Sequence, residues 1–211
     1  RAEYMADDRV KDGDQRYAYF LRHNQKLPWD WFGGVGVQRV SDDTYFTDLS
    51  TQISKTSQVQ LPSDLFIGGG GSWGAAGGYG LNALVQRWQT LQPDPLQPVT
   101  PAYNRLPQIT FTASRPEVLF SEFDFYGQYT TFDHPTLTSG TRMVAYPSLS
   151  LPVRLPYASL TPKVGVNVTR YLVDTNSAGY SDQDRALPIF SADSSVVFER
   201  PTSIGGTSFL P

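Results

Sequence analysis

The chain of 211 residues contains 17 Lys and Arg, 20 Asp and Glu, and no Cys. This near-balanced charge and the lack of cysteine exclude a disulfide scaffold, a cysteine-ligated metal site and a nucleic-acid-binding protein driven by positive charge. Only 39% of the residues are hydrophobic, and no apolar run reaches the ~18 residues that a membrane-spanning helix needs.

Alternation between apolar and polar residues dominates the chain and predicts β-strands, because successive side chains of a strand point to opposite faces. Residues 1–5 are strand-like. The apolar faces of the strands that follow are formed by Tyr17, Tyr19 and Leu21; Trp29, Trp31, Val35 and Val37; Tyr79, Leu81, Ala83 and Val85; Ile109, Phe111 and Ala113; Leu119, Phe123, Phe125 and Tyr129; Leu149, Leu151, Val153 and Leu155; and Leu160, Pro162, Val164, Val166, Val168 and Leu172. We expect about nine strands and no helix.

Turn-forming residues separate these strands at 12–14, 42–43, 92–95, 138–140 and 176–179. Several prolines fall inside predicted strands, where each removes a hydrogen bond of the ladder. They are Pro147, Pro152, Pro156, Pro162 and Pro188. Glycines crowd the segment 67–80, and glycine within a strand indicates a bend or a close backbone approach.

The pattern predicts an all-β fold, an antiparallel meander of strands whose length and alternation suit transmembrane strands in a partial segment of an outer-membrane β-barrel. Outer-membrane strands carry apolar residues only at alternate positions, so an unremarkable mean hydropathy is compatible with one apolar face. No composition shift marks a domain boundary, and residues 1–211 are therefore interpreted as one incomplete barrel domain. The chain lacks a secretion signal at its start, as expected of a fragment.

Aromatic residues tend to fall near the proposed strand ends, where membrane barrels have aromatic girdles. Aromatics are also common in any sheet, so both interpretations stay open.

Two short patterns resemble enzyme motifs, but neither indicates catalysis. Residues Gly70–Gly74 match the G-x-S-x-G nucleophile elbow, which requires a following helix that the sequence does not predict. Glu122 and Asp124 lie two apart on one strand face, whereas paired catalytic acids flank a substrate from different elements. We therefore expect two acids that face a polar lumen.

The two histidines, His23 and His134, have no metal-ligand spacing around them. Each is interpreted as a surface or lumen residue. We expect no cofactor and no bound metal.

Several segments resemble the LptD family of outer-membrane proteins in order and spacing. Residues 2–8 resemble its EYLPxD strand end, although Met5-Ala6 replaces the usual Leu-Pro, and Arg16-Tyr17 fits the R-aromatic strand that follows. Residues 40–49 are similar to VSDxxYFxDL, the most specific match, and residues 106–108 to LPQ. The blocks 184–191 and 197–200 resemble R-x-L-P-x-F and VFER.

The resemblance implies a bacterial outer-membrane location and a very large barrel plugged by the lipoprotein LptE, with no enzymatic activity. Such a barrel delivers lipopolysaccharide into the outer leaflet through its lumen and a lateral opening between its first and last strands. A periplasmic domain, absent from this chain, receives lipopolysaccharide from bridge proteins. The implied partners are thus lipopolysaccharide, LptE, those bridge proteins and outer-membrane lipid, but no nucleic acid. The chain would supply a wall segment from the N-terminal half of the barrel, without the closing strands.

The alternation assigns side chains to the two sides of such a wall. A hydrated, phosphorylated sugar head group needs a polar path, and charge on the lipid side costs ~2–4 kcal/mol at mid-membrane. The expected lumen-facing residues are Glu122, Asp124, Gln128, Lys163, Asn167 and Thr169. Asn167 and Thr169 belong to an N-glycosylation motif, but they are interpreted as lumen-facing residues of a strand. The expected lipid-facing residues are Phe123, Phe125, Val164, Val166 and Val168.

Two alternatives remain at the level of sequence. An outer-membrane enzyme that modifies lipid would need a Ser, His and acid cluster at the rim of a barrel. A soluble sugar-binding β-sandwich would alternate as well, but it would bury its apolar face between two sheets.

Overall fold

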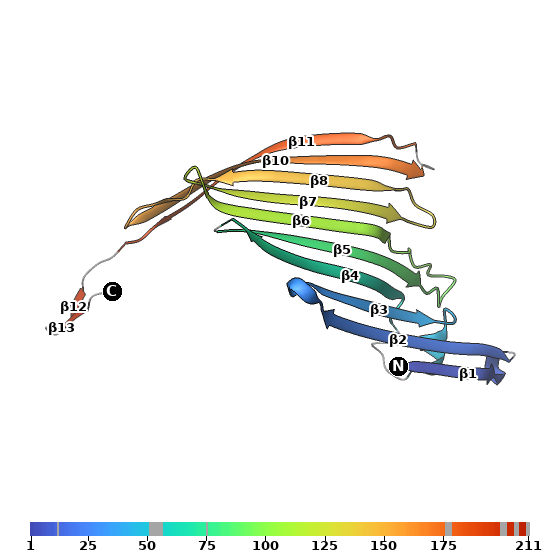
Figure 1. The fold of residues 1–211 in the computed structure, drawn as a ribbon. Coiled ribbons are helices and arrows are strands. Elements are labelled where there is room, and N and C mark those ends of the chain that lie inside the picture. Colours follow the sequence, from blue (N-terminus) through green and yellow to red (C-terminus); the bar gives the residue numbers. More distant parts are fainter. Residues whose placement is uncertain are drawn as a thin grey trace.

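A computed structural model describes residues 1–11, 13–50, 57–74, 76–175, 179–198, 202–204 and 207–209. Most of them form one curved sheet of eleven strands with β1 and β11 at its edges (Figure 1). The path of the sheet runs through β1 (Ala2–Asp8), β2 (Asp14–Lys26), β3 (Phe32–Val40), β4 (Gln60–Trp73), β5 (Gly77–Thr90), β6 (Asn104–Val118), β7 (Ser121–Asp133), β8 (Ser139–Ser150), β10 (Ala158–Thr175) and β11 (Gln183–Val196).

Every strand on this path pairs antiparallel with the strand before it, and β9 (Val153–Arg154) pairs with β10 beside the path. A separate two-stranded sheet joins β12 (Thr202–Ile204) and β13 (Thr207–Phe209). The all-β antiparallel meander expected from the alternation is therefore confirmed. Among the described residues there is one extended layer rather than two packed sheets, which does not fit the β-sandwich alternative.

The expectation of no helix was wrong for short connections of the described chain, namely η1 (Arg9–Lys11), η2 (Pro28–Asp30) and α1 (Tyr45–Leu49). None of them exceeds five residues, too short to give a helical period in the sequence. Across the described ranges, no helix has the length and apolar character needed to cross a membrane.

Three strand boundaries differ from the sequence prediction. The strand predicted to carry the face from Leu119 to Tyr129 begins only at Ser121. Leu119 and Phe120 form a hairpin turn and have positive φ angles of 52° and 71°. Trp29 lies in η2 rather than in a strand, with a φ of 59°. Neither turn contains Asn-Gly or Asp-Gly, the strongest sequence signal of a two-residue hairpin.

The third difference concerns β8. Ser139 and Gly140, predicted to lie in a turn, are the first residues of this strand. The predicted strand around Leu149 to Leu155 is instead divided, because β8 ends at Ser150 and only Val153 and Arg154 form β9. Ser139 and Gly140 adopt a strand conformation despite their turn propensity, because β8 pairs with β7 on one side and β10 on the other.

The glycine-rich segment forms the β4–β5 hairpin. Gly70 lies directly across from Gly80. A Cβ at Gly69 would collide with the ring of Trp31, and a Cβ at Gly70 would collide with the backbone oxygen of Tyr79. The close backbone approach expected of these glycines is therefore confirmed.

The connections differ between the two ends of the sheet. At one end, here called the loop end, the chain passes through η1, residues 41–59 with α1, residues 91–103 and residues 134–138. At the other, the turn end, the connections are 27–31, 74–76, 119–120 and 151–157. The arrowhead of β3 points to the loop end (Figure 1).

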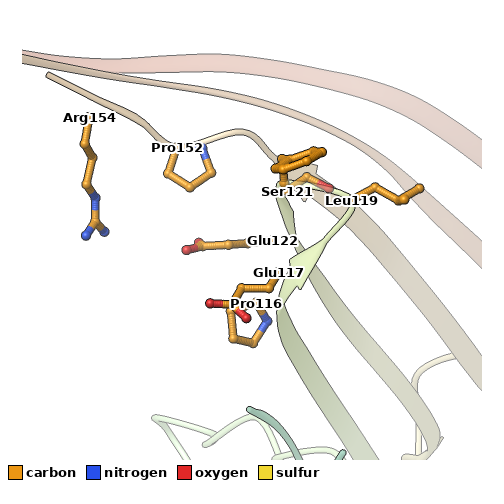
Figure 2. A pocket seen from close by; sticks show the side chains of 8 residues that line it. Pro116, Glu117, Leu119, Ser121, Glu122, Pro152 and Arg154 are labelled. Atoms are coloured by element: carbon orange, nitrogen blue, oxygen red, sulfur yellow. The ribbon is translucent and has the colours of Figure 1, made fainter. Parts of the chain in front are cut away.

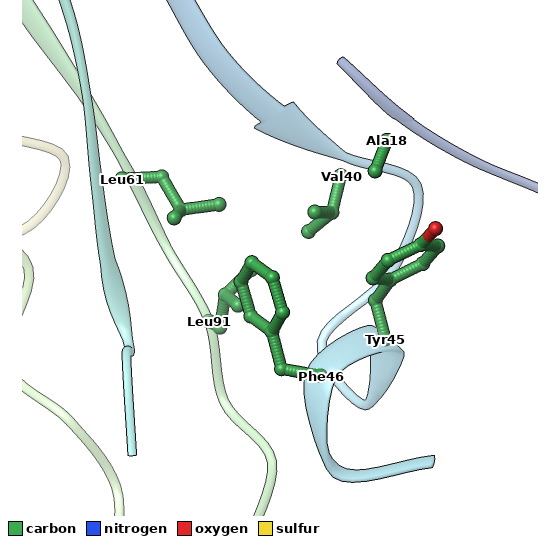
Figure 3. Packing of buried hydrophobic residues seen from close by; sticks show 6 residues of the cluster. All are labelled: Ala18, Val40, Tyr45, Phe46, Leu61 and Leu91. Carbon is green, nitrogen blue, oxygen red and sulfur yellow. The ribbon is translucent and has the colours of Figure 1, made fainter. Parts of the chain in front are cut away.

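A small hydrophobic core lies at the loop end, where α1 packs against β2, β3 and β4 (Figure 3). Its members are Ala18, Val40, Tyr45, Phe46, Leu61 and Leu91. Leu61 is fully buried and Leu91 almost so. Burial of a leucine side chain stabilises by ~1.5–3 kcal/mol, so this core fixes α1 against the ends of the strands.

Candidate functional site

The candidate site is one face of β7, β8 and β10, on which all six residues predicted to face a lumen lie together. Glu122 lies across from Ser150, which lies across from Lys163, and Asp124 lies across from Ser148. Residues paired in this way share a face of the sheet. The face that carries Glu122, Asp124, Gln128, Lys163, Asn167 and Thr169 is called the polar face below.

An ion pair crosses this face. The Lys163 ammonium lies 3.3 Å from Asp124 Oδ2, spanning β8 from β10 to β7. Both side chains remain accessible, so we expect this ion pair to stabilise by only ~0–1 kcal/mol. Its importance is that opposite charges share a solvated surface.

Nearer the loop end, the neutral amides of the face act as hydrogen-bond acceptors. Arg142 Nη2 donates to Gln128 Oε1 at 2.6 Å, and Thr169 Oγ1 donates to Asn167 Oδ1 at 3.0 Å. These bonds orient side chains on the face.

The five residues predicted to face lipid lie together on the opposite side, called the apolar face. Phe123 and Val164 both lie across from Leu149, while Val168 lies across from Ala145. Phe125 contacts Phe111 of β6 at a ring separation of 6.0 Å. The three β10 valines are each about 40% exposed, so the face is apolar and uncovered.

A cavity of about 810 Å³ adjoins the polar face at the turn end (Figure 2). Glu122 and Arg154 approach it from β7 and β9, and Glu117 lies beside them. Charges of both signs therefore surround this end of the face.

A cluster of ion pairs centres on the buried guanidinium of Arg16 at the loop end. Its side chain is 3% exposed and lies 3.1 Å from Asp8, 2.9 Å from Asp42 and 3.1 Å from Asp48. Its Cζ also lies 5.4 Å from the centre of the Tyr45 ring. Arg16 thus joins the β1–β2 hairpin to α1.

These contacts shift the acidity of the groups around α1. Burial alone would raise the pKa of the Asp42 carboxyl, but hydrogen bonds from Ser41 and Arg16 outweigh it and hold the pKa below its ordinary value. The pKa of Asp48 is lowered in the same way, with burial outweighed mainly by hydrogen bonds from Thr44 and Lys11.

The pKa of the Tyr45 phenol shifts in the other direction. Burial and a hydrogen bond to Glu3 at 2.8 Å raise the pKa of Tyr45 to about 12. It therefore stays neutral and donates that bond at ordinary pH.

The ladder between β3 and β4 is completed by a side chain. Backbone pairing stops at Val37 and Ser63. Beyond it, Val40 N donates to Gln89 Oε1 at 3.1 Å and Gln89 Nε2 donates to Val40 O at 2.9 Å. The Gln89 amide satisfies the groups that a strand residue would have paired.

The enzyme-like motifs do not assemble into a site. The chain turns at Gly74 and enters β5 rather than a helix, so Gly70–Gly74 is a hairpin and not a nucleophile elbow. His134 is buried, which corrects the prediction of a surface or lumen position. Its described partners are loop backbone groups, the hydroxyls of Thr136 and Ser139, and the ring of Tyr103. In the described ranges, no group of three or more His, Asp or Glu could hold a metal ion.

Sequence reasoning missed three polar-face residues of β8: Arg142, Tyr146 and Ser148. Alternation through residues 141–150 could have found them, but the predicted turn at 138–140 and Pro147 concealed the strand. It also missed the Arg16 cluster, since ion pairs between residues so distant in sequence leave no periodic signal.

Comparison with known proteins gives a consistent result. Residues 14–210 match the family described as LptD, LPS transport system D. The chain is 42% identical to an LPS-assembly protein LptD of Azoarcus sp. strain BH72 over 99% of its length, and 37% identical to one of Nitrosomonas eutropha, again over 99%. It spans only 26% and 29% of those two relatives, respectively.

Proposed function

Because the chain belongs to the LptD family of LPS transport proteins, we propose that its sheet forms part of the wall of a barrel in the bacterial outer membrane. In this proposal the barrel moves lipopolysaccharide into the outer leaflet. The chain spans about a quarter of the length of its relatives, and the proposal therefore treats it as one segment of such a barrel.

One observation carries the proposal: polar and apolar side chains are separated onto the two faces of β7, β8 and β10. Asp124 and Lys163 lie on one face, while Val164 and Val166 lie on the other. A charged group facing lipid at mid-membrane costs ~2–4 kcal/mol. The polar face is therefore assigned to the lumen, and the apolar face to lipid.

The connections support an orientation. Outer-membrane barrels have short periplasmic turns and longer extracellular loops. The long connections 41–59 and 91–103 lie at the loop end, and the short ones 74–76 and 119–120 at the turn end. The loop end is therefore assigned to the cell exterior.

The cargo has apolar acyl chains and a phosphorylated sugar head, so it needs a wide hydrated lumen with fixed polar groups. Glu122, Gln128, Asn167 and Thr169 supply such groups along the polar face. A plug lipoprotein, LptE, is assigned to the same lumen, and the periplasmic bridge proteins to a part of the protein outside this chain.

In-cell photocrosslinking in the full-length protein tests the proposal. Probes are placed at Asp124 and Asn167 on the polar face, with Phe125 and Val166 as their sequence neighbours on the apolar face. We expect adducts with lipopolysaccharide or with the plug lipoprotein at the first pair only, and bulk lipid at the second. Equal labelling of both pairs by bulk lipid would reject transport along this face.

A further inference from the structure

A small hollow of about 300 Å³ lies on the polar face near the loop end. Phe132 of β7, Gly140 and Arg142 of β8, Tyr171 of β10 and Tyr103 before β6 surround it. Phe132 lies across from Gly140, and Arg142 across from Tyr171. The hollow therefore belongs to the same face as Gln128 and Asn167 and lies closer to the loops.

The floor of the hollow is backbone. A Cβ at Gly140 would collide with the carbonyl oxygen of Leu172 on the neighbouring strand. Only glycine therefore fits here without displacing β10, and the absence of a side chain leaves the space between the flanking rings open.

Aromatic rings form the walls and are held in place. The Tyr103 and Phe132 rings meet edge to face at 6.0 Å, and Tyr103 lies 4.6 Å from the ring of His134. The Tyr103 hydroxyl donates to the Thr138 carbonyl at 3.0 Å. Tyr103 and Tyr171 nonetheless keep about 40% of their surface exposed, so their faces are available to a ligand.

His134 orders the two connections that border the hollow. Its Nδ1 accepts hydrogen bonds from the backbone N–H groups of Thr136 and Leu137, at 3.1 and 2.7 Å. Its Nε2 lies 2.9 Å from the carbonyl oxygen of Pro101 and donates to it. Residues 101–103 and 134–138 are thereby fixed to each other, which positions the Tyr103 ring.

Arg142 provides a positive charge that no acidic side chain among the described residues neutralises. Its guanidinium donates to the neutral amide of Gln128 and lies 5.3 Å over the Phe132 ring. It makes no ion pair with a described residue, and its Nε is buried without a partner there. A planar guanidinium with free N–H groups matches the oxygens of a phosphate or carboxylate.

We infer that this hollow binds an anionic sugar, with the ring stacked between Tyr103, Phe132 and Tyr171 and its phosphate or carboxylate paired with Arg142. Apolar C–H faces of a sugar ring suit aromatic walls, and the volume suits a single saccharide unit rather than an acyl chain. The inference rests on the proposed function, since it locates one sugar of the head group near the exterior end of the polar face.

Binding is measured by ligand-observed NMR titration of the full-length protein, purified from the outer membrane in detergent. The probes are glucose 6-phosphate, glucuronate, glucose and inorganic phosphate. We expect the two anionic sugars, or one of them, to bind at least about tenfold more tightly than glucose and phosphate, because a charge-assisted hydrogen bond adds at least that factor. Preference for glucose 6-phosphate indicates a phosphorylated sugar, and preference for glucuronate an acidic one.

Two variants and a matched control locate the binding. Arg142→Gln removes the charge, and Tyr171→Leu removes one aromatic ring that lines the hollow. Each should weaken binding of the preferred anionic sugar about tenfold. Arg22→Gln replaces an arginine on the polar face of β2, far along the sheet from the hollow, and should leave binding unchanged. Unchanged affinity in Arg142→Gln, or phosphate binding as tightly as the sugar phosphate, would overturn the inference.

The outcome is separable from that of the transport proposal. Lipopolysaccharide adducts at Asp124 without sugar binding that depends on Arg142 would leave transport intact and reject the hollow as a site. Sugar binding that depends on Arg142 without such adducts would support the site and reject transport along this face.

Discussion

Val166 and Asn167 are neighbours in β10, yet the pleat of the strand turns their side chains to opposite faces. Val166 lies across from Pro188 and Asn167 across from Leu187. This pair offers the sharpest contrast between the two faces, because both positions share the same strand and nearly the same depth.

The substitution Val166→Lys should destabilise the full-length barrel by ~2–4 kcal/mol if the apolar face contacts lipid. Asn167→Lys should change stability by less than ~1 kcal/mol, because the lumen hydrates the charge. The unfolding midpoint of each variant in lipid vesicles, followed by the heat-dependent gel shift of barrels, measures the difference. Similar losses in both variants would contradict the assignment of the faces.

At the loop end, Arg16 should control the response to acid. Asp42 and Asp48 have lowered pKa values in the folded state. The stability they contribute is present above their unfolded pKa, near 3.9, and is lost as the pH falls through the folded value. We therefore expect the unfolding midpoint of the full-length protein to decrease when the pH drops below about 4.

Arg16→Met is the matching control, since it removes the cation and keeps much of the volume. It should cost ~2–4 kcal/mol at pH 7, less than a fully enclosed pair, because Asp42 and Asp48 are each about one-third exposed. Its midpoint should also depend less on acid than that of the unchanged protein. Equal acid dependence in both would place its origin elsewhere.

The strands are long and regular, but proline and turn residues interrupt particular ladders. The β8–β10 ladder lacks the pairs opposite Tyr146 and Pro147, and resumes at Ala145 and Val168. The predicted weakening by Pro147 is thus seen at this position. The β6–β7 ladder shifts register on both sides of its middle, at Pro107 and at Pro116.

The β6–β7 hairpin is closed by residues poorly suited to it. Leu119 and Phe120 have positive φ angles and are about 90% exposed. A side chain in this region costs ~1–2 kcal/mol per residue, and two-residue hairpins favour Asn-Gly. We expect the double substitution Leu119→Asn with Phe120→Gly to raise stability by ~1–2 kcal/mol, measured as the unfolding midpoint of the full-length protein.

A loss of stability instead would mean that Leu119 and Phe120 make contacts worth more than the strain. Both line the turn-end cavity beside Glu122, where such contacts with the rest of the protein would form. Substitution of Leu119 alone by Ala, which keeps the backbone strain, separates the two effects.

As a whole, the described sheet is open. Strand β1 pairs only with β2, and β11 only with β10, so each leaves one row of backbone groups unpaired. In hydrocarbon each unmet backbone group costs several kcal/mol. The two edges therefore require pairing with other strands before the sheet can enter a membrane.

We expect residues 1–211 expressed alone to fail to insert into lipid vesicles as a monomer. The full-length protein, refolded in the same vesicles, is the control. Resistance to protease and heat-dependent gel mobility report insertion. A monomeric, protease-resistant form of the isolated chain would contradict the expectation that its edges need partners.

Local signals were enough for some features of the chain and not for others. The faces of Phe123 to Gln128 and of Lys163 to Thr169 followed from alternation, because neighbours along a strand always point to opposite sides. The turn at Leu119 and Phe120 could not be predicted, since its residues have no intrinsic preference for positive φ. The start of β8 was missed because Ser139 and Gly140 resemble a turn until strands pair on both sides.

By itself, the sequence determined the all-β class, the antiparallel order and the side of the strand on which Asp124, Lys163 and Val166 lie, since these depend on a period of two residues. Only the tertiary structure decided the register between neighbouring strands. It brought Arg16 to Asp42, Lys163 to Asp124, and Arg142 to the rings of Phe132 and Tyr171. Those contacts depend on register between strands, which is set by the pairing of many backbone groups at once and not by any short stretch of residues.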